Sequence, residues 1–220
     1  MFILISGADY PIKTAEKIGH DLSTSPYDVH IRYERIRFND YEREWQELCY
    51  KRYCSLRFRI PSLDRRLKLT QRMIELSHPL ITTPFLPFSN KLSCFAGEAW
   101  FCANRLAAEY LIDFHNTEPA LANHYRRADR ALVHHGRRLG HAICPEESYY
   151  QTILCNASHL KISDNHWRYI DWSQGGPHPA HPKTLLMEDL LQLQKSTAHF
   201  ARKFDTDVDE KILDVLDTFT

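Results

Sequence analysis

Charge of either sign is not in excess in this 220-residue sequence, because 28 Lys and Arg residues balance 28 Asp and Glu residues. A chain without net charge gives no case for nucleic acid as a partner, so we expect none. Basic residues are nevertheless concentrated between Lys51 and Arg72, where Asp64 is the only acid. This stretch is typical of a solvated basic face, and the alternative is a surface near an anionic substrate.

Several signals of other protein classes are also missing. None of the six cysteines forms a Cys-x-x-Cys pair, which indicates reduced, buried thiols instead of zinc ligands or a dense disulfide framework. No apolar run approaches the roughly 20 residues that a membrane-spanning helix needs, and the short apolar start lacks the basic lead-in of a signal peptide. We therefore expect a protein that is cytoplasmic or peripheral to a membrane. The phosphate-binding loop, the dinucleotide-binding glycine fingerprint, the Gly-x-Ser-x-Gly elbow and the zinc-protease His-Glu-x-x-His motif are absent as well.

Short apolar runs alternate with helical patterns, which predicts an α/β domain. Phe2–Ile5 is a continuous apolar run, typical of a strand buried on both faces of a parallel sheet. Because an interior strand needs a neighbour on each side, we expect part of the fold to precede it. Pro11 predicts the first turn of a helix, and Asp209 predicts the cap of the last helix. No internal repeat is present, so we predict a single domain of residues 1–220.

The most informative segment is Pro145–Ser148, in which two carboxylates, Glu146 and Glu147, stand in the first turn of a predicted helix. The simpler interpretation is that the positive end of the helix dipole stabilises both acids. The alternative is a catalytic base, because sugar transfer with inversion requires one carboxylate to take the proton of the acceptor hydroxyl. A helix N-terminus lowers the pKa of such a base and burial in a sugar pocket raises it, so both interpretations stay open.

Asp205, Asp207 and Asp209 repeat an acid-x-acid spacing that suits a metal bridging a nucleotide diphosphate. The acids directly precede the predicted last helix, so capping by Asp209 is the simpler explanation and we predict no metal site. Trp172, at the end of a predicted strand, is suited equally to stacking on a sugar ring and to packing in the core.

Four segments, in this order, resemble the core-2/I-branching and peptide O-xylosyltransferase family: Ile5–Thr14, Phe95–Phe101, Pro145–Leu154 and Phe200–Asp205. Trp167–Ser173, followed by His181–Lys183, adds to a resemblance that covers essentially the whole chain. It implies a GT-A-like fold and an inverting transfer from a UDP-sugar to a saccharide or hydroxyl acceptor, with N-acetylglucosamine or xylose as the sugar. It also implies that no divalent metal and no other cofactor is needed.

The resemblance assigns roles by position in these motifs. It implies that Glu147 is the catalytic base and that Lys203 and Lys183 bind the donor diphosphate. We expect Glu147 and Lys203 to face one cleft. The residues placed in or beside the acceptor pocket are Trp172, Glu98, Trp100 and Asp9. Where xylosyltransferase-like members carry an acid after the second motif, this chain has Ala99, so the acceptor is not defined.

Members of the family carry a further N-terminal part that builds most of the uridine pocket. We expect this chain to lack that part, which makes its GT-A-like fold incomplete. A second hypothesis is therefore a truncated, inactive fragment that binds glycans weakly. A third is a metal-dependent glycosyltransferase that uses Asp205 and Asp207. Peripheral membrane association is compatible with each hypothesis, and the sequence predicts no oligomeric state.

Overall fold

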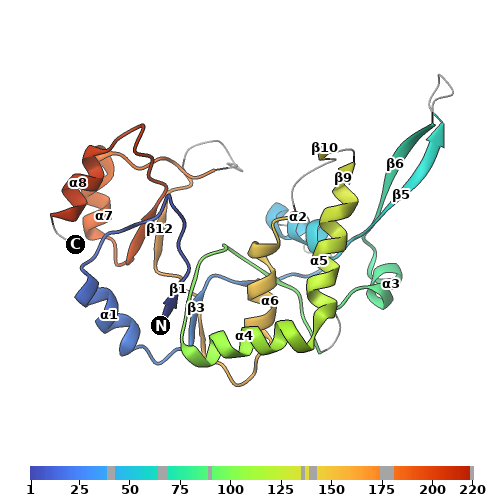
Figure 1. The fold of residues 1–220 in the computed structure, drawn as a ribbon, viewed down its shortest axis with the longest axis horizontal. Helices are drawn as coiled ribbons and strands as arrows, with labels where there is room; N and C mark the ends of the chain where they lie inside the picture. Colours follow the sequence, from blue (N-terminus) through green and yellow to red (C-terminus); the bar gives the residue numbers. More distant parts are fainter. Residues whose placement is uncertain are drawn as a thin grey trace. The chain divides into compact units, whose positions relative to one another are not determined.

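The computed structural model describes residues 1–38, 43–63, 69–88, 91–134, 137–138, 143–173 and 181–218. Short strands and helices alternate along them (Figure 1), which confirms the mixed α/β class. The chain divides into two compact units: unit 1 is Met1–Arg32, Trp100–Leu106 and Lys161–Thr220, and unit 2 is Tyr33–Ala99 and Ala107–Leu160. The GT-A-like fold, its incompleteness and the single domain stay predictions.

The first sheet of unit 1 has the strand order β1-β8-β3-β11. Its strands are β1 (Phe2–Ile3), β8 (Phe101–Ala103), β3 (Val29–Ile31) and β11 (Ile162–Ser163). β1 and β3 are antiparallel to β8, and β11 is parallel to β3. Within the described ranges β1 is an edge strand, so the prediction of an interior strand of a parallel sheet is wrong. Phe2 and Ile5 are 59% and 54% exposed, because strand pairing, and not the apolar run itself, decides which faces are covered.

The second sheet of unit 1 has the order β12-β13-β2, with β12 parallel and β2 antiparallel to β13. Its strands are β12 (Arg168–Ile170), β13 (Phe200–Arg202) and β2 (Tyr10–Pro11). The 3-10 turn η3 (Met187–Asp189) leads into α7 (Leu190–Lys195), and α8 (Lys211–Asp217) follows β13. Ala201 of β13, Leu193 of α7 and Ile212 of α8 belong to one buried core, so both helices pack against this sheet (Figure 1).

Helix α1 (Ala15–Ser23) begins four residues later than the sequence predicts. Pro11 lies in β2 instead of in a helix, and its register with Phe200 fixes it there. Thr14 caps α1, because its Oγ1 accepts a hydrogen bond of 3.1 Å from the amide of Lys17. A threonine cap thus outweighs the tendency of proline to open a helix.

Unit 2 is built mainly of helices around one core. Its elements are β4 (Glu34–Arg35), α2 (Glu44–Tyr53), β5 (Leu56–Leu63), β6 (Leu69–Leu76), α3 (Pro79–Thr82), η1 (Thr83–Phe85), β7 (Phe95–Ala96), α4 (Arg105–Thr117, which starts in unit 1), α5 (Pro119–Leu132), β9 (Val133–His134), β10 (Arg137–Arg138), η2 (Pro145–Glu147) and α6 (Tyr149–Cys155). Tyr53 of α2, Tyr125 of α5 and Ile153 of α6 are buried together, and β4 pairs with β7 beside them. The chain is therefore anchored in this core on both sides of the acidic motif, by Ile143 before it and by Ile153 of α6 after it.

All six cysteines are free, as the sequence predicts, but only four of them are buried, because Cys144 and Cys155 are partly exposed. No helix in the described part of the chain is long and apolar enough to cross a membrane. Residues 64–68, which include part of the basic stretch, lie outside the described residues.

Candidate active site

The acidic motif forms the 3-10 turn η2 instead of the first turn of an α-helix, and α6 begins only at Tyr149. Cys144, just before the turn, has the left-handed conformation φ 49°, ψ 63°, which redirects the chain into Pro145. The hydroxyl of Tyr53 donates to the carbonyl of Cys144 at 3.2 Å. A turn of three residues aligns few peptide dipoles, so the dipole effect on Glu147 is weak.

The carboxylate of Glu147 lies against the guanidinium of Arg52, whose Nη1 donates to Oε2 at 3.2 Å. Burial raises the pKa of Glu147 above its ordinary value, Arg52 opposes that rise, and Glu146 and Glu98 add to it. Among the contributions of its surroundings to this pKa, burial is the largest. A carboxyl with a raised pKa is a stronger base once ionised, which suits proton abstraction.

Strand β7 brings Glu98 to the same place. The amide of Gly97 donates to the carbonyl of Glu147 at 2.8 Å, and Gln151 Nε2 donates to the carbonyl of Glu98 at 2.7 Å. These bonds join two motifs that are far apart in the sequence. The segments of Glu98 and Glu147 are thus neighbours in unit 2, while Glu147 as the base and Glu98 as an acceptor residue stay predictions.

In unit 1, predicted residues meet at one edge of the β12-β13-β2 sheet. β12 and β13 are parallel and end in register at Ile170 and Arg202. Because β2 is antiparallel to β13, Asp9, just before β2, lies at this edge too. Lys203 directly follows β13, Trp172 lies two residues after the end of β12, and Trp172 is 44% exposed. The carboxyl edge of parallel strands is where α/β proteins bind their ligands.

Arg202 connects two of the predicted acceptor residues. Its guanidinium carbon lies 4.2 Å from the centroid of the Trp100 ring, and its Nε lies 3.7 Å from Asp9 Oδ1. The side chain of Asp9 is fully buried, and its Oδ2 accepts from the amide of Ser6 at 2.6 Å. Neither Arg202 nor Arg52 is among the site residues that the sequence predicts. Arg202 directly precedes Lys203 in the motif, and Arg52 belongs to the basic stretch.

The two predicted diphosphate ligands differ in their surroundings. Lys183 Nζ lies 2.7 Å from Asp189 Oδ1 and 3.1 Å from Glu188 Oε1, and these hydrogen bonds, that of Asp189 first, raise the pKa of Lys183 to about 12. Lys203 lies on a neighbouring segment, since its carbonyl accepts from the amide of Leu185 at 2.8 Å. In the ranges that the structure describes, no ion pair engages Lys203. Its ammonium is thus more available to a ligand than that of Lys183.

The aspartates near the C-terminus are used locally. Asp205 Oδ1 accepts from the amide of Asp207 at 3.1 Å, and Asp209 Oδ2 accepts from the amide of Met187 at 3.0 Å. The cap position of α8 is Glu210, and no side chain caps that helix. The prediction that Asp209 caps the last helix is therefore wrong, because its carboxylate accepts from the first amide of η3 instead.

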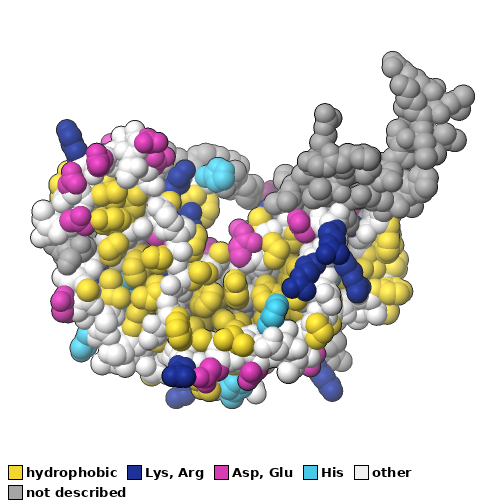
Figure 2. Space-filling model, viewed as in Figure 1, with side chains coloured by type: hydrophobic (Ala, Val, Ile, Leu, Met, Phe, Trp, Pro, Cys, Tyr) yellow, Lys and Arg dark blue, Asp and Glu magenta, His cyan; other side chains and the backbone are white. Residues whose placement is uncertain are grey.

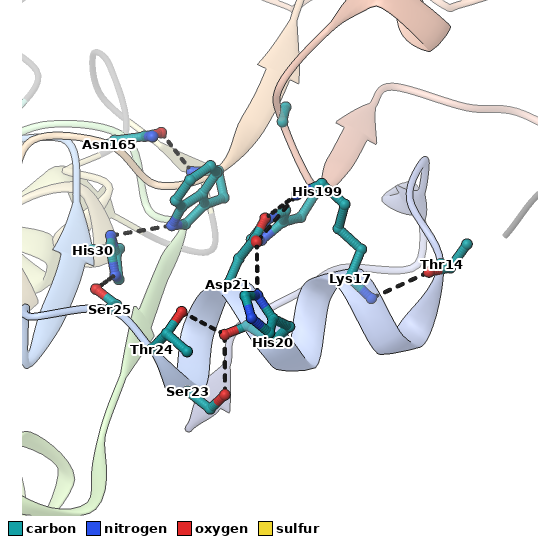
Figure 3. Close-up of polar contacts among 12 residues, drawn as sticks. Thr14, Lys17, His20, Asp21, Ser23, Thr24, Ser25, His30, Asn165 and His199 are labelled. Carbon is teal, nitrogen blue, oxygen red and sulfur yellow. Dashed lines mark hydrogen bonds and ion pairs between the residues drawn. The ribbon is translucent and has the colours of Figure 1, made fainter.

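A group of polar side chains in unit 1 was not predicted from the sequence (Figure 3). His199 is fully buried, its ring stacks on Trp167 at 4.1 Å, and its Nε2 lies 3.0 Å from Asp21 Oδ2. Trp167 Nε1 donates to His30 Nδ1 at 3.1 Å. Burial lowers the pKa of both His199 and His30, and hydrogen bonds from Lys17 and His199 lower the pKa of Asp21 to about 2. No local pattern reveals this group, because its members come from distant segments.

Glu147 and Glu98 belong to unit 2, whereas Lys203, Lys183, Trp172, Trp100 and Asp9 belong to unit 1. That Glu147 and Lys203 face one cleft stays a prediction.

Comparison with known proteins gives a consistent result. The family model described as "Core-2/I-Branching enzyme" matches residues 1–194. Two proteins of Arabidopsis thaliana are similar to the chain. Beta-glucuronosyltransferase GlcAT14B is 27% identical over 99% of this chain and 43% of its own length, and Beta-glucuronosyltransferase GlcAT14A is 26% identical over 98% and 41%. The chain thus spans about two fifths of the length of these curated relatives.

Proposed function

The chain belongs to the core-2/I-branching enzyme family, and on this basis we propose that it acts as a glycosyltransferase. The proposed reaction moves a sugar from a UDP-sugar to a hydroxyl of a saccharide, with inversion at the anomeric carbon. Glu147 is the general base, and the ammonium of Lys203 binds the donor diphosphate.

One observation supports the base assignment above the others. Glu147 is held by the half-buried guanidinium of Arg52 on one side, its carbonyl is fixed by Gly97, and burial raises the pKa of its carboxyl. A carboxylate that only stabilised the start of a helix would need neither this cation nor the second motif against it. This arrangement suits a group that accepts a proton.

The chemistry follows from these groups. The acceptor oxygen forms a bond to the anomeric carbon while its proton passes to Glu147, and the bond from that carbon to the diphosphate oxygen breaks. The departing UDP then carries an additional negative charge, which the ammonium of Lys203 stabilises. The ammonium of Lys183 is paired with Asp189 and Glu188. Its proposed contribution to diphosphate binding is therefore to hold the segment that contacts Lys203 through Leu185.

The donor sugar belongs to the proposal as well. The sequence resemblance favours N-acetylglucosamine or xylose, and the printed names of the two relatives add glucuronic acid as a candidate. A carboxylate-bearing sugar needs a cation in the donor site. Arg202 is such a cation at the same sheet edge as Lys203. We therefore include UDP-glucuronic acid in the test.

Release of UDP from UDP-N-acetylglucosamine, UDP-xylose and UDP-glucuronic acid, with a saccharide acceptor mixture, tests the proposal. One donor should be turned over, and Glu147→Gln should lower kcat by about 100-fold or more, as the loss of a general base does. Glu118→Gln, an exposed acid of unit 2, is the matched control and should retain the full rate. An unchanged rate for Glu147→Gln would refute the base assignment, and no turnover of any donor would favour the inactive, glycan-binding alternative.

A further inference from the structure

In unit 2, the short helical segment formed by α3 and η1 presents apolar side chains to solvent. Leu80 is 86% exposed, Phe85 is 71% exposed and Ile81 is 49% exposed. Thr82, a polar residue of the same segment, is instead only 1% exposed. A surface segment that faces only water would place its polar residue outside and its apolar residues inside. The reversed pattern indicates a surface that a partner covers.

The exposed apolar surface continues onto the β5–β6 hairpin. Phe58 of β5 and Ile74 of β6 are cross-strand partners, and they are 49% and 36% exposed. Phe58 and Phe85 line one hollow of about 670 Å³, whose walls come from β5, η1 and α5. The two elements therefore present one continuous surface. We call it the apolar patch, and its residues are Phe58, Ile74, Leu80, Ile81 and Phe85.

Positive charge borders the apolar patch. Helix α5 carries three exposed arginines, Arg126, Arg127 and Arg130, and Arg127 also lines the hollow. Figure 2 shows Lys and Arg side chains over α5, beside hydrophobic side chains over α3. Within the described part of residues 51–88, five Lys and Arg residues stand against one acid, Glu75, whose carboxylate is itself paired with an arginine of the hairpin. The whole chain has no net charge, so this excess of cations is a local property of the surface.

We propose that the apolar patch docks on a membrane surface that contains anionic lipids. The interface of such a bilayer offers an apolar interior beneath a layer of negative headgroups, so it complements both the patch and its basic border. Leu80 and Phe85 enter the acyl-chain boundary, and the arginines of α5 bind the headgroups while their aliphatic stems stay on apolar surface. This inference goes beyond the proposed transfer reaction and does not depend on it.

The exposure of the side chains favours a bilayer over a protein partner. A leucine that is 86% exposed projects from the surface with few contacts to its own chain. A fluid bilayer accepts a projecting side chain without a preformed hole, whereas a protein partner would need a pocket shaped for it. Diffuse positive charge also suits a layer of headgroups, because no single fixed pair is required.

Sedimentation of the protein with lipid vesicles tests the proposal. The vesicles consist of phosphatidylcholine alone or of phosphatidylcholine with about 30% phosphatidylserine, which carries the negative charge. The protein should bind the anionic vesicles at least about tenfold more tightly than the neutral ones. Raising the salt concentration from about 0.1 M to about 0.5 M should weaken this binding, because salt screens the attraction between the arginines and the headgroups.

Leu80→Ser and Phe85→Ser should each weaken binding to anionic vesicles by about tenfold or more, because each removes an inserted apolar side chain. Ile112→Ser removes an apolar side chain that is 60% exposed on α4, and as the matched control it should bind like the wild type. Arg127→Ser should weaken binding to anionic vesicles and reduce its salt dependence. Lys195→Ser, an exposed cation of α7 in unit 1, should do neither.

A fluorescent side chain reports insertion directly. Phe85→Trp should retain binding, since tryptophan suits the membrane interface, and lipids with brominated acyl chains should quench its added emission. The added emission of Ile112→Trp should not be quenched. Thermal unfolding shows which variants are folded, and Leu80→Ser replaces Phe85→Ser if the latter does not fold.

Three results would overturn the proposal: no binding to anionic vesicles, equal binding to both kinds of vesicle, or unchanged binding by folded Leu80→Ser and Phe85→Ser variants. Size-exclusion chromatography identifies the main competing occupant. A wild-type dimer that binds no vesicles and that both substitutions dissociate would assign the apolar patch to a second copy of the chain instead.

Discussion

Arg52 Nη1 donates to Glu147 Oε2 at 3.2 Å, from a helix that lies far from the acidic motif in the sequence. Burial raises the pKa of this carboxyl, and the positive charge of the guanidinium is the largest effect that lowers it. It thus holds the carboxylate in one orientation and favours its ionised form, both of which a general base needs.

Arg52→Leu should shift the pH dependence of kcat/KM. The base acts only when it is ionised, so the rate rises with pH through its pKa. Removal of the opposing cation raises that pKa further, so the acid limb of the profile moves to higher pH. The rate at about pH 6 should fall more than the rate at about pH 8. Arg52→Lys keeps the charge and should leave the limb near its wild-type position, whereas a uniform loss at all pH values would mean that Arg52 serves the fold alone.

Lys203→Met and Lys183→Met should separate binding from stability. Lys203 has no ion pair in the described residues, so its loss should raise the KM for the donor by about tenfold while unfolding changes little. Lys183→Met leaves the buried carboxylate of Asp189 without its cation and should lower the free energy of unfolding by roughly 1–3 kcal/mol. Donor kinetics and urea unfolding of both variants provide the measurement. The reverse pattern would exchange the two assignments.

Stability should fall as the pH is lowered from neutral to mildly acidic values. The pKa values of His199 and His30 are below their ordinary value in the folded protein, because burial opposes their charged form. The unfolded chain then binds protons more readily, so their contribution is complete above the ordinary pKa of about 6.5 and is lost below it. Asp21, with its pKa lowered to about 2, contributes in the same direction at still lower pH.

Urea unfolding followed by tryptophan fluorescence at several pH values checks this sign. His199→Gln should flatten the decline between about pH 7 and about pH 5, where neutral histidines take up protons on unfolding. His20→Gln, whose side chain is 75% exposed, is the matched control and should retain the decline. If the free energy of unfolding declined equally with pH in both variants, groups other than His199 would cause the pH dependence.

Chelation of divalent metals should leave donor turnover unchanged, and Asp205→Asn should alter catalysis little. The physical reason is that Lys203 supplies positive charge to the diphosphate, while Asp205 Oδ1 accepts from the amide of Asp207 in a turn. Turnover measured with and without a chelator, and with added Mn²⁺ or Mg²⁺, decides the point. Strict dependence on a metal that is abolished by Asp205→Asn would favour the metal-dependent hypothesis.

The sequence by itself determined the family, the mixed α/β class, the free cysteines and the identity of the acidic motif. These properties depend on residue types in a fixed order, which is visible without long-range contacts. The family resemblance gave Glu98 and Glu147 separate roles. That their segments meet is visible only in the structure, in the hydrogen bonds between Gly97 and Glu147 and between Gln151 and Glu98.

Only the tertiary structure decided which partner each polar or apolar group has. Phe2–Ile5 has the composition of an interior strand, but pairing with β8 alone leaves Phe2, Leu4 and Ile5 exposed. Asp209 has the position of a helix cap, but its carboxylate accepts a hydrogen bond from the amide of Met187 instead. The surroundings of Glu147 come from the packing of Arg52 and of the segment after β7 around a short turn. In each case the deciding contact joins residues distant in the sequence, and local propensity carries no information about such contacts.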